Sequence, residues 1–311
     1  MLKILTNNRI VNYLKRISLP GFEDIPVWNI ILFFWNGLIN GAITTRASAI
    51  AFSFFIALFP LLLFLFSLIP YVPIDNFQEE LLGLLIDVMP RNAFLATRDT
   101  ISDIVLRERF DLLSIGFISM LAFATNGVNS LMTAFAATYH SFKGRNWINQ
   151  YLVSMLLVCI LSVLIITAVV LTVSGRSLIK IFNQRDVLTN DINYFVLVVG
   201  QWLIIILLFF TAVAIIYYFA PSKRGKFRLF SAGTTLATLL MLISSWGFSY
   251  YINNFGQYNK LYGSIGTVIV ILLWLYFNAL SLLIGFELNI SISNARKQEL
   301  DLNKEGVLIE S

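Results

Sequence analysis

Charged residues are scarce in this chain. Asp, Glu, Lys and Arg make up 13% of its 311 residues, whereas soluble domains carry about 25%. A soluble fold also needs a polar surface, and 58% of the residues here are hydrophobic. This composition excludes a water-soluble globular enzyme and indicates that the natural solvent of the chain is a lipid bilayer.

Cysteine and histidine are almost absent as well. The single cysteine, Cys159, allows no intrachain disulfide and no cysteine-based metal site. The single histidine, His140, excludes a histidine cluster. We therefore expect no catalytic residue, no metal site and no cofactor.

Six long intervals contain no Asp, Glu, Lys or Arg. A membrane-spanning helix needs about 20 apolar residues, and a charge at its centre costs about 2.5 to 3.5 kcal/mol. The empty intervals therefore predict an all-α, polytopic membrane bundle of six transmembrane helices. We expect these helices at residues 47–70, 112–138, 150–174, 193–219, 228–252 and 263–290.

A seventh uncharged interval, residues 25–45, has a more mixed character. Its apolar residues recur at helical spacing, its asparagines gather on the other face, and two glycines weaken the helix. We predict an amphipathic N-terminal helix lying in the membrane interface, with a seventh span as the alternative. The residues concerned are Trp28, Ile31, Leu32, Trp35, Leu38 and Ile39 on the apolar face, Asn29, Asn36 and Asn40 on the polar face, and Gly37 and Gly41.

The distribution of Lys and Arg predicts the orientation. Fourteen of them fall on the side of the two termini and eight on the other side, and cytoplasmic loops are enriched in basic residues. Both termini are therefore expected in the cytoplasm. Acidic residues collect in the first external loop, where residues 75–90 and 93–109 have the spacing of amphipathic helices. These patterns divide the chain into a cytoplasmic segment (1–24), a membrane domain (25–292) and a flexible cytoplasmic tail (293–311).

Interrupted spans are where the pathways of transporters tend to lie. Pro60 removes a backbone hydrogen bond near the middle of the first span, where Ser53 is available to compensate. A plain packing kink is the more common explanation of such a proline. The second span contains the densest polar cluster of the six, which fits a pathway wall and interhelical hydrogen bonding alike. This cluster contains Asn126, Gly127, Asn129 and Ser130.

Charges near the membrane edges have simpler interpretations. Arg46, at the start of the first span, is first of all an anchor. For Glu287, snorkelling to the cytoplasmic interface is the preferred interpretation and a buried coupling role is the alternative. A basic loop between the fourth and fifth spans is a topology signal that also attracts anionic headgroups, at about 1 kcal/mol per Lys or Arg. This loop contains Lys223, Arg224, Lys226 and Arg228.

Five motifs follow one another in the order of a known family. Together they resemble the YihY/BrkB family of bacterial inner-membrane proteins over about residues 25–292. The resemblance implies six spans with cytoplasmic ends in the bacterial inner membrane. The motifs are RASAIAFSFFIALFPLL (46–62), YFAP (218–221), NFGQYNKLYGSIG (254–266), LWLY (273–276) and GFELN (285–289).

The resemblance says less about activity, because some members carry the label ribonuclease BN and others that of a serum-resistance or virulence factor. Phosphodiester hydrolysis needs carboxylates or imidazoles that hold metal ions, or a paired general acid and base. The inner acids outside the tail are only Glu23, Asp24 and Glu287. We therefore expect neither an enzyme nor a nucleic-acid partner.

Two hypotheses of different class remain. The first is a transporter, or a translocator of lipids or amphiphiles, with its pathway near the interrupted first and second spans. The second is a non-transporting membrane scaffold for partners in the cell envelope. The expected partners are membrane lipids with anionic headgroups at the cytoplasmic face, and either further copies of the chain or envelope proteins.

Overall fold

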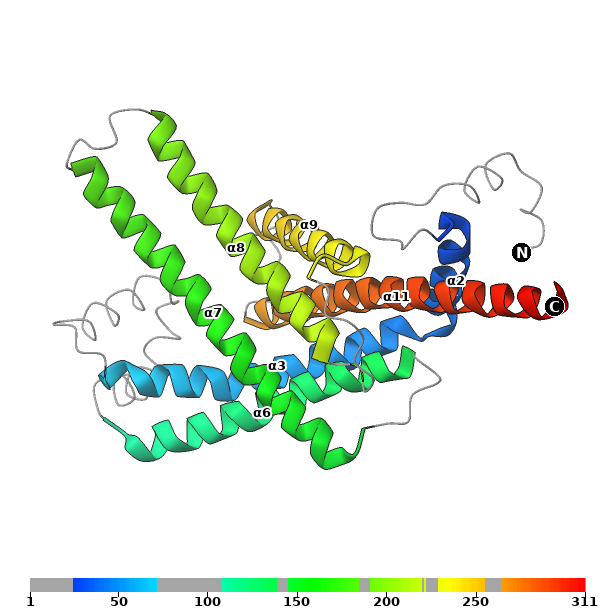
Figure 1. The fold of residues 1–311 in the computed structure, drawn as a ribbon. Helices are drawn as coiled ribbons and strands as arrows, with labels where there is room; N and C mark the ends of the chain where they lie inside the picture. The colour runs from blue at the N-terminus through cyan, green and yellow to red at the C-terminus, as the bar shows by residue number, and fades with distance from the viewer. Residues whose placement is uncertain are drawn as a thin grey trace. The chain divides into compact units, whose positions relative to one another are not determined.

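The computed structural model describes residues 25–71, 108–138, 145–184, 191–219, 221, 229–254 and 264–310, and this part of the chain is helical without a strand. The result confirms the predicted all-α class. The α-helices are α2 (Val27–Asn40), α3 (Ile43–Leu68), α6 (Phe110–Thr138), α7 (Trp147–Gln184), α8 (Asp191–Phe219), α9 (Ala232–Asn254) and α11 (Ser264–Glu310), and a short 3-10 helix, η2 (Ile69–Tyr71), follows α3 (Figure 1).

Six of these helices are long and apolar enough to cross a membrane, which confirms the predicted number. The amphipathic helices predicted for the first external loop lie outside the described residues, as does the N-terminal segment 1–24. The candidate spans are Ile43–Tyr71, Phe110–Ala137, Trp147–Thr172, Val199–Phe219, Ala232–Tyr251 and Val268–Gln298.

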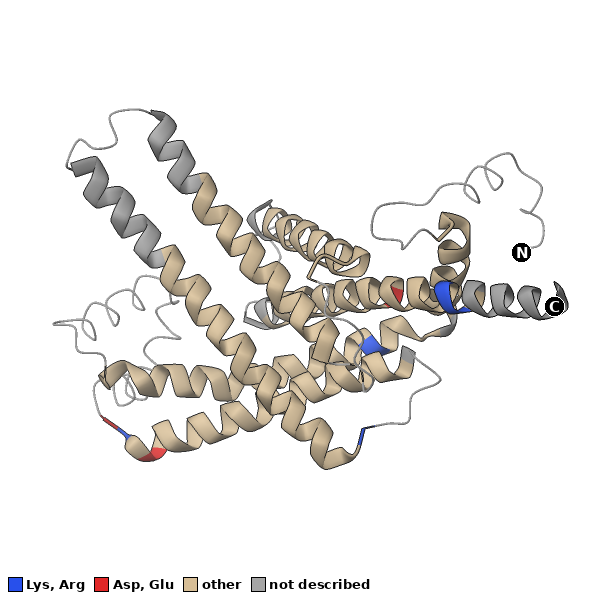
Figure 2. Cartoon of the chain, in the orientation of Figure 1, with Lys and Arg blue, Asp and Glu red and all other residues tan. Residues whose placement is uncertain are grey.

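Large apolar side chains cover much of the outer surface of these helices. Phe52 is 60% exposed, Trp202 62% and Trp246 74%. Exposed apolar surface on this scale is unfavourable in water and indicates contact with a membrane. The described parts of the helices are correspondingly almost free of charge (Figure 2).

The chain divides into two compact units, and α3 and α6 contribute to both. The smaller unit, Phe52–Gly127, contains the later part of α3 and the earlier part of α6. Gly116 lets these two backbones approach, because a Cβ on it would lie 3.1 Å from the Cα of Phe64. The ring of Phe64 then packs against that of Phe117, with 5.6 Å between the ring centroids.

The larger unit comprises the residues up to Ala51 and from Val128 onwards. Within it α11 packs against α9 and α2, α8 packs against α9, and α7 pairs with α8 (Figure 1). Small residues permit close approach of membrane helices, and α9 and α11 meet in this way at Gly233 and Gly285.

Three buried aromatic rings pack together in the larger unit. Phe135 of α6 stacks on Phe286 of α11 with 4.1 Å between the centroids. Tyr217 of α8 meets both rings edge-on, and its hydroxyl donates a hydrogen bond of 2.7 Å to the carbonyl of Leu282. The ring supplies apolar contact while the buried hydroxyl keeps a partner.

Several serine and threonine side chains in the described helices form a hydrogen bond within their own helix. A serine or threonine hydroxyl in a membrane helix can donate to the carbonyl four residues earlier, which avoids an unsatisfied group in an apolar environment. The structure shows this bond for Ser48, Ser67, Thr133, Ser154, Thr167, Thr172, Thr211, Thr235 and Ser281.

The first and last helices bear on predictions made from the sequence. The N-terminal helix α2 has 14 residues, about 21 Å at 1.5 Å per residue, which is too short for a hydrocarbon core of about 30 Å. This length favours the interfacial interpretation over a seventh span.

The last helix, α11, continues to Glu310, so most of the predicted tail 293–311 extends the helix of the sixth span.

Candidate functional site: a buried charge pair

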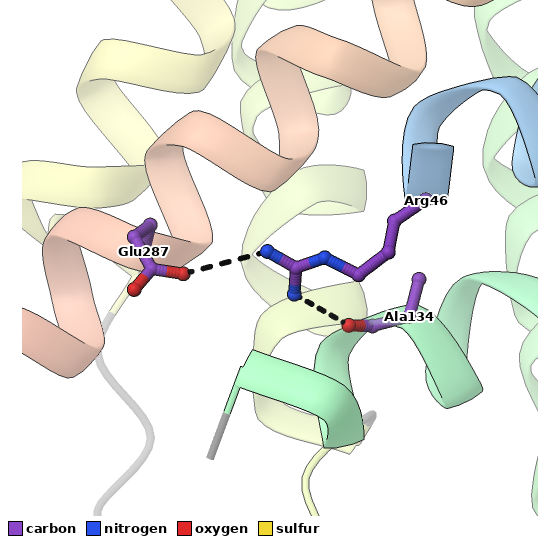
Figure 3. Close-up of polar contacts among 3 residues, drawn as sticks. All are labelled: Arg46, Ala134 and Glu287. Atoms are coloured by element: carbon purple, nitrogen blue, oxygen red, sulfur yellow. Dashed lines mark hydrogen bonds and ion pairs between the residues drawn. The ribbon is translucent and has the colours of Figure 1, made fainter. Parts of the chain in front are cut away.

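Arg46 and Glu287 approach each other inside the larger unit (Figure 3). Nη2 of Arg46 lies 3.9 Å from Oε2 of Glu287, and the two side chains are 10% and 7% exposed. Nη1 of Arg46 donates a hydrogen bond of 2.9 Å to the carbonyl oxygen of Ala134. The guanidinium therefore connects a carboxylate and a backbone carbonyl from two other helices.

The positions of the three residues along their helices explain this geometry. Arg46 lies in the first turn of α3, and Ala134 lies in the last part of α6. The carbonyl end of a helix carries a partial negative charge, which favours a cation beside it. Glu287 lies eleven residues before Gln298, the last residue of its candidate span, a distance of about 16 Å along the helix.

Two glycines, one in the last turn of α2 and one directly after it, make room for the pair. A Cβ on Gly37 of α2 would fall on the carboxylate of Glu287. A Cβ on Gly41 would lie 2.8 Å from Nη2 of Arg46. The turn between α2 and α3 is completed by Ala42, whose φ of 45° lies in the left-handed region. The sequence suggested that these glycines weaken a helix, whereas the structure shows them at the surface that covers the pair.

The structure corrects the preferred interpretation of Glu287. The sequence favours snorkelling because it predicts that the sixth span ends near residue 290, about one turn beyond this acid. The helix instead continues to Glu310, and Glu287 is only 5% exposed. The carboxylate lies against Gly37 and Arg46, which agrees with a buried position. Arg46 likewise contacts protein groups, so its predicted role as an anchor to the interface is incomplete.

A charge pair of this kind is costly to build. Removing two charges from water carries a desolvation cost that their attraction repays only with good partners. Charged residues within membrane spans are therefore rare, and they pair with one another or with backbone carbonyls. Both kinds of contact occur at Arg46, so we take this pair as the candidate functional site.

Four of the residues predicted to line a pathway belong to the smaller unit. Ser53 and Pro60 lie on α3, and the helix continues through the proline. On α6, Asn126 is exposed while Gly127 is buried, with the ring of Phe54 only 3.3 Å from where a Cβ of this glycine would be. The smaller unit thus presents the Asn126 amide on its surface.

The other two predicted pathway residues, Asn129 and Ser130, belong to the larger unit. Oδ1 of Asn129 accepts a hydrogen bond of 2.7 Å from Nε2 of Gln150 on α7. The same Gln150 amide also contacts Thr133 Oγ1 at 3.1 Å. Asn129 therefore makes the interhelical hydrogen bond that the sequence left as its alternative role.

The predicted headgroup-binding residues Lys223, Arg224, Lys226 and Arg228 lie outside the described residues. The helix that follows them, α9, begins in a polar node that the sequence did not reveal. Asn289 of α11 accepts a hydrogen bond from the Gly233 N–H at 2.8 Å and donates one to Ser231 Oγ at 2.9 Å. Ser231 in turn accepts a hydrogen bond from the Thr234 N–H at 3.1 Å, as an N-cap residue does.

The sequence signal for this node is a serine near the start of the fifth span, and its partner asparagine lies more than 50 residues further on. Gln150 was also missed. It stands at the start of the third span, where an amide looks like an interface residue, and its partner Asn129 belongs to the preceding helix.

Fold and composition together define an integral, multi-pass membrane protein. The chain belongs to the virulence factor BrkB family, whose profile matches residues 34–307. This match confirms the resemblance to the YihY/BrkB family. No solved structure matches the chain.

Curated relatives agree with this assignment. YfkH of Bacillus subtilis (strain 168), whose name describes it as ribonuclease-like, is 27% identical over 253 residues, 81% of this chain and 91% of the relative. The UPF0761 membrane protein NTHI0384 of Haemophilus influenzae (strain 86-028NP) is 24% identical over 280 residues, 88% of this chain and 98% of the relative. The UPF0761 membrane protein Smlt0865 of Stenotrophomonas maltophilia (strain K279a) is 24% identical over 279 residues, 87% of this chain and 62% of the relative.

Proposed function

We propose that this membrane protein is a transporter, or a translocator of lipids or other amphiphiles. We propose also that the helices joined by the Arg46–Glu287 pair move against one another during transport. The observation that supports the proposal is the burial of both charges, at 10% and 7% exposure, within candidate spans that hold few other charged residues. Ionisable residues inside a membrane domain commonly mark substrate pathways or the elements that control them.

The helices that meet at the pair suit such a role. Arg46 of α3 binds Ala134 of α6 and Glu287 of α11, and Gly37 of α2 covers the carboxylate. Separating these helices would strand a buried charge, so the pair favours one arrangement strongly over others. Rigid-body movements of protein parts can repack salt bridges at the interface between them.

The charge content of the spans suggests the class of solute. The charged residues within the six candidate spans are Arg46, Asp111, Glu287, Arg296 and Lys297. The last two lie near the end of the sixth span, Val268–Gln298. Because Arg46 and Glu287 neutralise each other, we propose a neutral or amphiphilic solute rather than an ion. The pathway is proposed to use the amides and the interrupted helices predicted above, at Ser53, Pro60, Asn126, Gly127, Asn129 and Ser130.

Translocation of lipid is tested with purified protein in vesicles of phosphatidylethanolamine and phosphatidylglycerol. Fluorescent NBD-phosphatidylethanolamine in the outer leaflet is bleached by dithionite, so loss of the inner-leaflet signal measures translocation. We expect wild-type protein to accelerate the loss and Glu287→Gln to slow it. Asp111→Asn is the matched control, since it also removes a carboxylate charge but at an exposed position.

Two results would argue against the proposal. Wild-type vesicles that behave like protein-free vesicles would exclude this lipid as a substrate. For other solutes, a deletion strain complemented fully by the Asn126→Leu/Asn129→Leu double variant would exclude the proposed pathway. The alternative scaffold function then becomes the better explanation, because it needs no such pathway.

We propose further that the protein lies in the bacterial inner membrane with both termini in the cytoplasm and with anionic lipids at the Lys223–Arg228 loop. The excess of Lys and Arg on the terminal side supports this orientation. A reporter fused after Gly144 is expected to be active in the cytoplasm. Reporter activity in the periplasm would contradict the proposed orientation.

We also propose that the protein is not a nuclease, although one relative is named ribonuclease-like. Hydrolysis of RNA uses metal-binding clusters or a paired acid and base, and the described residues contain no group of three or more His, Cys, Asp or Glu that is able to hold a metal ion. Purified protein incubated with RNA and Mg²⁺ is expected to leave the RNA intact. Cleavage that depends on Glu287 would refute this proposal.

A further inference from the structure

Helix α2 has three distinct faces. One face packs on α11 through Ile30 and Phe33, which join a buried cluster with Ile292. A second face is apolar and uncovered, formed by Ile31, Trp35 and Ile39 at 39%, 51% and 63% exposure. A third face carries Asn29 and Asn36, both exposed.

These faces follow from helical spacing of 100° per residue. Ile31, Trp35 and Ile39 recur every four residues and form a stripe. Asn29 and Asn36 are seven residues apart and therefore lie almost in line on a neighbouring stripe. A helix with one side on protein, one apolar side and one polar side matches a position between protein, acyl chains and water.

The connection to α3 places this helix at the bilayer surface. Only Gly41 and Ala42 separate α2 from α3, which begins a candidate span at Ile43. Consecutive Cα atoms lie about 3.8 Å apart, so the end of α2 lies within about 12 Å of the start of the span. Trp35 is also of the residue type enriched at the membrane–water interface.

The same helix contacts the charge pair. Gly37 lies on the α11-facing side of α2, one turn beyond Phe33, and the carboxylate of Glu287 occupies the space that a side chain would fill. Because a helix moves as a stiff body, displacement of the apolar stripe also displaces Gly37. Contact with lipid and cover of the charge pair are therefore mechanically linked.

We propose that the Ile31–Trp35–Ile39 face of α2 binds the boundary between headgroups and acyl chains, and that this contact clamps α2 onto α11 so that Gly37 closes over the Arg46–Glu287 pair. The bilayer is the partner of this surface. A helix released from the bilayer loses the clamp and opens the side of the pair that α2 covers. The inference does not depend on what the protein transports.

The lipid contact is tested by single-cysteine labelling in a Cys159→Ser background, which is available because the chain has one cysteine. Cysteines at Trp35, Ile39 and Asn36 are labelled with bimane in phosphatidylethanolamine–phosphatidylglycerol vesicles. Brominated phospholipids are expected to quench the labels at positions 35 and 39, and aqueous iodide the label at position 36. Iodide quenching at all three positions overturns the proposal, as does spontaneous cross-linking of position 39 between two copies, which would make a second chain the partner.

The clamp is tested by the rate of disulfide formation between cysteines introduced at Ile30 and Ile292, which share one buried cluster. Ile39→Asp places a charge on the lipid face, and Asn36→Asp places the same charge on the polar face as the matched control. We expect Ile39→Asp to slow cross-linking about tenfold, equivalent to about 1.4 kcal/mol, and Asn36→Asp to leave the rate unchanged.

Equal rates in the two aspartate variants overturn the clamp. A rate that is the same in vesicles and in detergent micelles overturns the role of the bilayer. Neither readout requires transport, so a failure here is distinguishable from a failure of the proposed function. Retained cross-linking in the Asn36→Asp protein also shows that the α2–α11 contact survives the introduction of an aspartate into α2.

Discussion

Gly233 of α9 and Gly285 of α11 approach each other so closely that a Cβ on either would collide with the carbonyl oxygen of the other. A Cβ on Gly285 would also lie 2.6 Å from the Tyr217 hydroxyl, which bonds to Leu282. Because helix association in lipid depends on packing rather than on exclusion of water, this contact is a main determinant of how α9 and α11 fit together.

We predict that Gly285→Ala destabilises the protein by separating α9 from α11. Overpacking a close interface typically costs about 1 to 3 kcal/mol. The measurement is the thermal midpoint of the GFP-tagged protein in detergent. Size-exclusion chromatography after heating gives the fraction of protein that remains folded at each temperature. Gly233→Ala is expected to act in the same direction.

Gly247→Ala is the matched control for this prediction. Gly247 lies on the same helix as Gly233, and a Cβ on it would meet nothing within 4 Å. Alanine favours a helix over glycine by about 0.5 to 1 kcal/mol, so the midpoint should stay level or rise. An equal fall for Gly247→Ala and Gly285→Ala would show that the packing argument is wrong.

A second prediction concerns the start of α9. Asn289→Ala removes two hydrogen bonds, to the Gly233 N–H and to Ser231 Oγ, each worth about 1 kcal/mol. We expect a lower thermal midpoint and faster proteolysis before α9. Asn278→Ala is the comparison, because the Asn278 amide donates to the Trp274 carbonyl of its own helix. Similar losses in both variants would contradict a special role for Asn289.

A third prediction distinguishes the asparagines of α6. Asn129 and Gln150 share a hydrogen bond, so Asn129→Leu and Gln150→Leu should be non-additive in a double-mutant cycle. Interhelical hydrogen bonds measured in this way average about 0.6 kcal/mol. Asn126 is exposed, so Asn126→Leu should be additive with Gln150→Leu. Coupling of Gln150 to Asn126 instead of Asn129 would refute the assignment.

A fourth prediction separates the two contributions of Tyr217. Tyr217→Phe keeps the ring in contact with Phe135 and Phe286 but removes the hydrogen bond to Leu282, and we expect a loss of about 1 kcal/mol. Tyr217→Leu removes the ring as well and should lower the thermal midpoint further. Equal midpoints for the two variants would mean that the ring contacts contribute nothing.

The spans were predictable because each depends on a property that residues have individually. A charge is unfavourable in lipid wherever its helix packs, so intervals such as 150–174 and 193–219 mark spans without any knowledge of neighbours. The end of the sixth span was harder to predict. Charges such as Arg296 suggest that a membrane segment stops, but they do not end a helix, and α11 continues past them.

The site was less predictable because it depends on pairs of residues far apart in the chain. Glu287 near a predicted helix end reads as an interfacial acid until Arg46 and Gly37 are found beside it. A glycine within a helix likewise suggests only a less stable helix. Its missing side chain becomes informative when the structure shows another group in the space that a side chain would fill. Asn289 was equally hard to predict, because a single amide in the sequence does not show which helix end it binds.

The length of α11 has a mechanical consequence. Its 47 residues measure about 70 Å at 1.5 Å per residue, and a hydrocarbon core occupies about 30 Å. A helix of this length that crosses along the membrane normal leaves about 40 Å outside the hydrocarbon. Such a rod converts a small tilt of the membrane segment into a displacement of its far end that is larger in proportion to its length, so a label on the last turn reports movements too small to see within the bilayer.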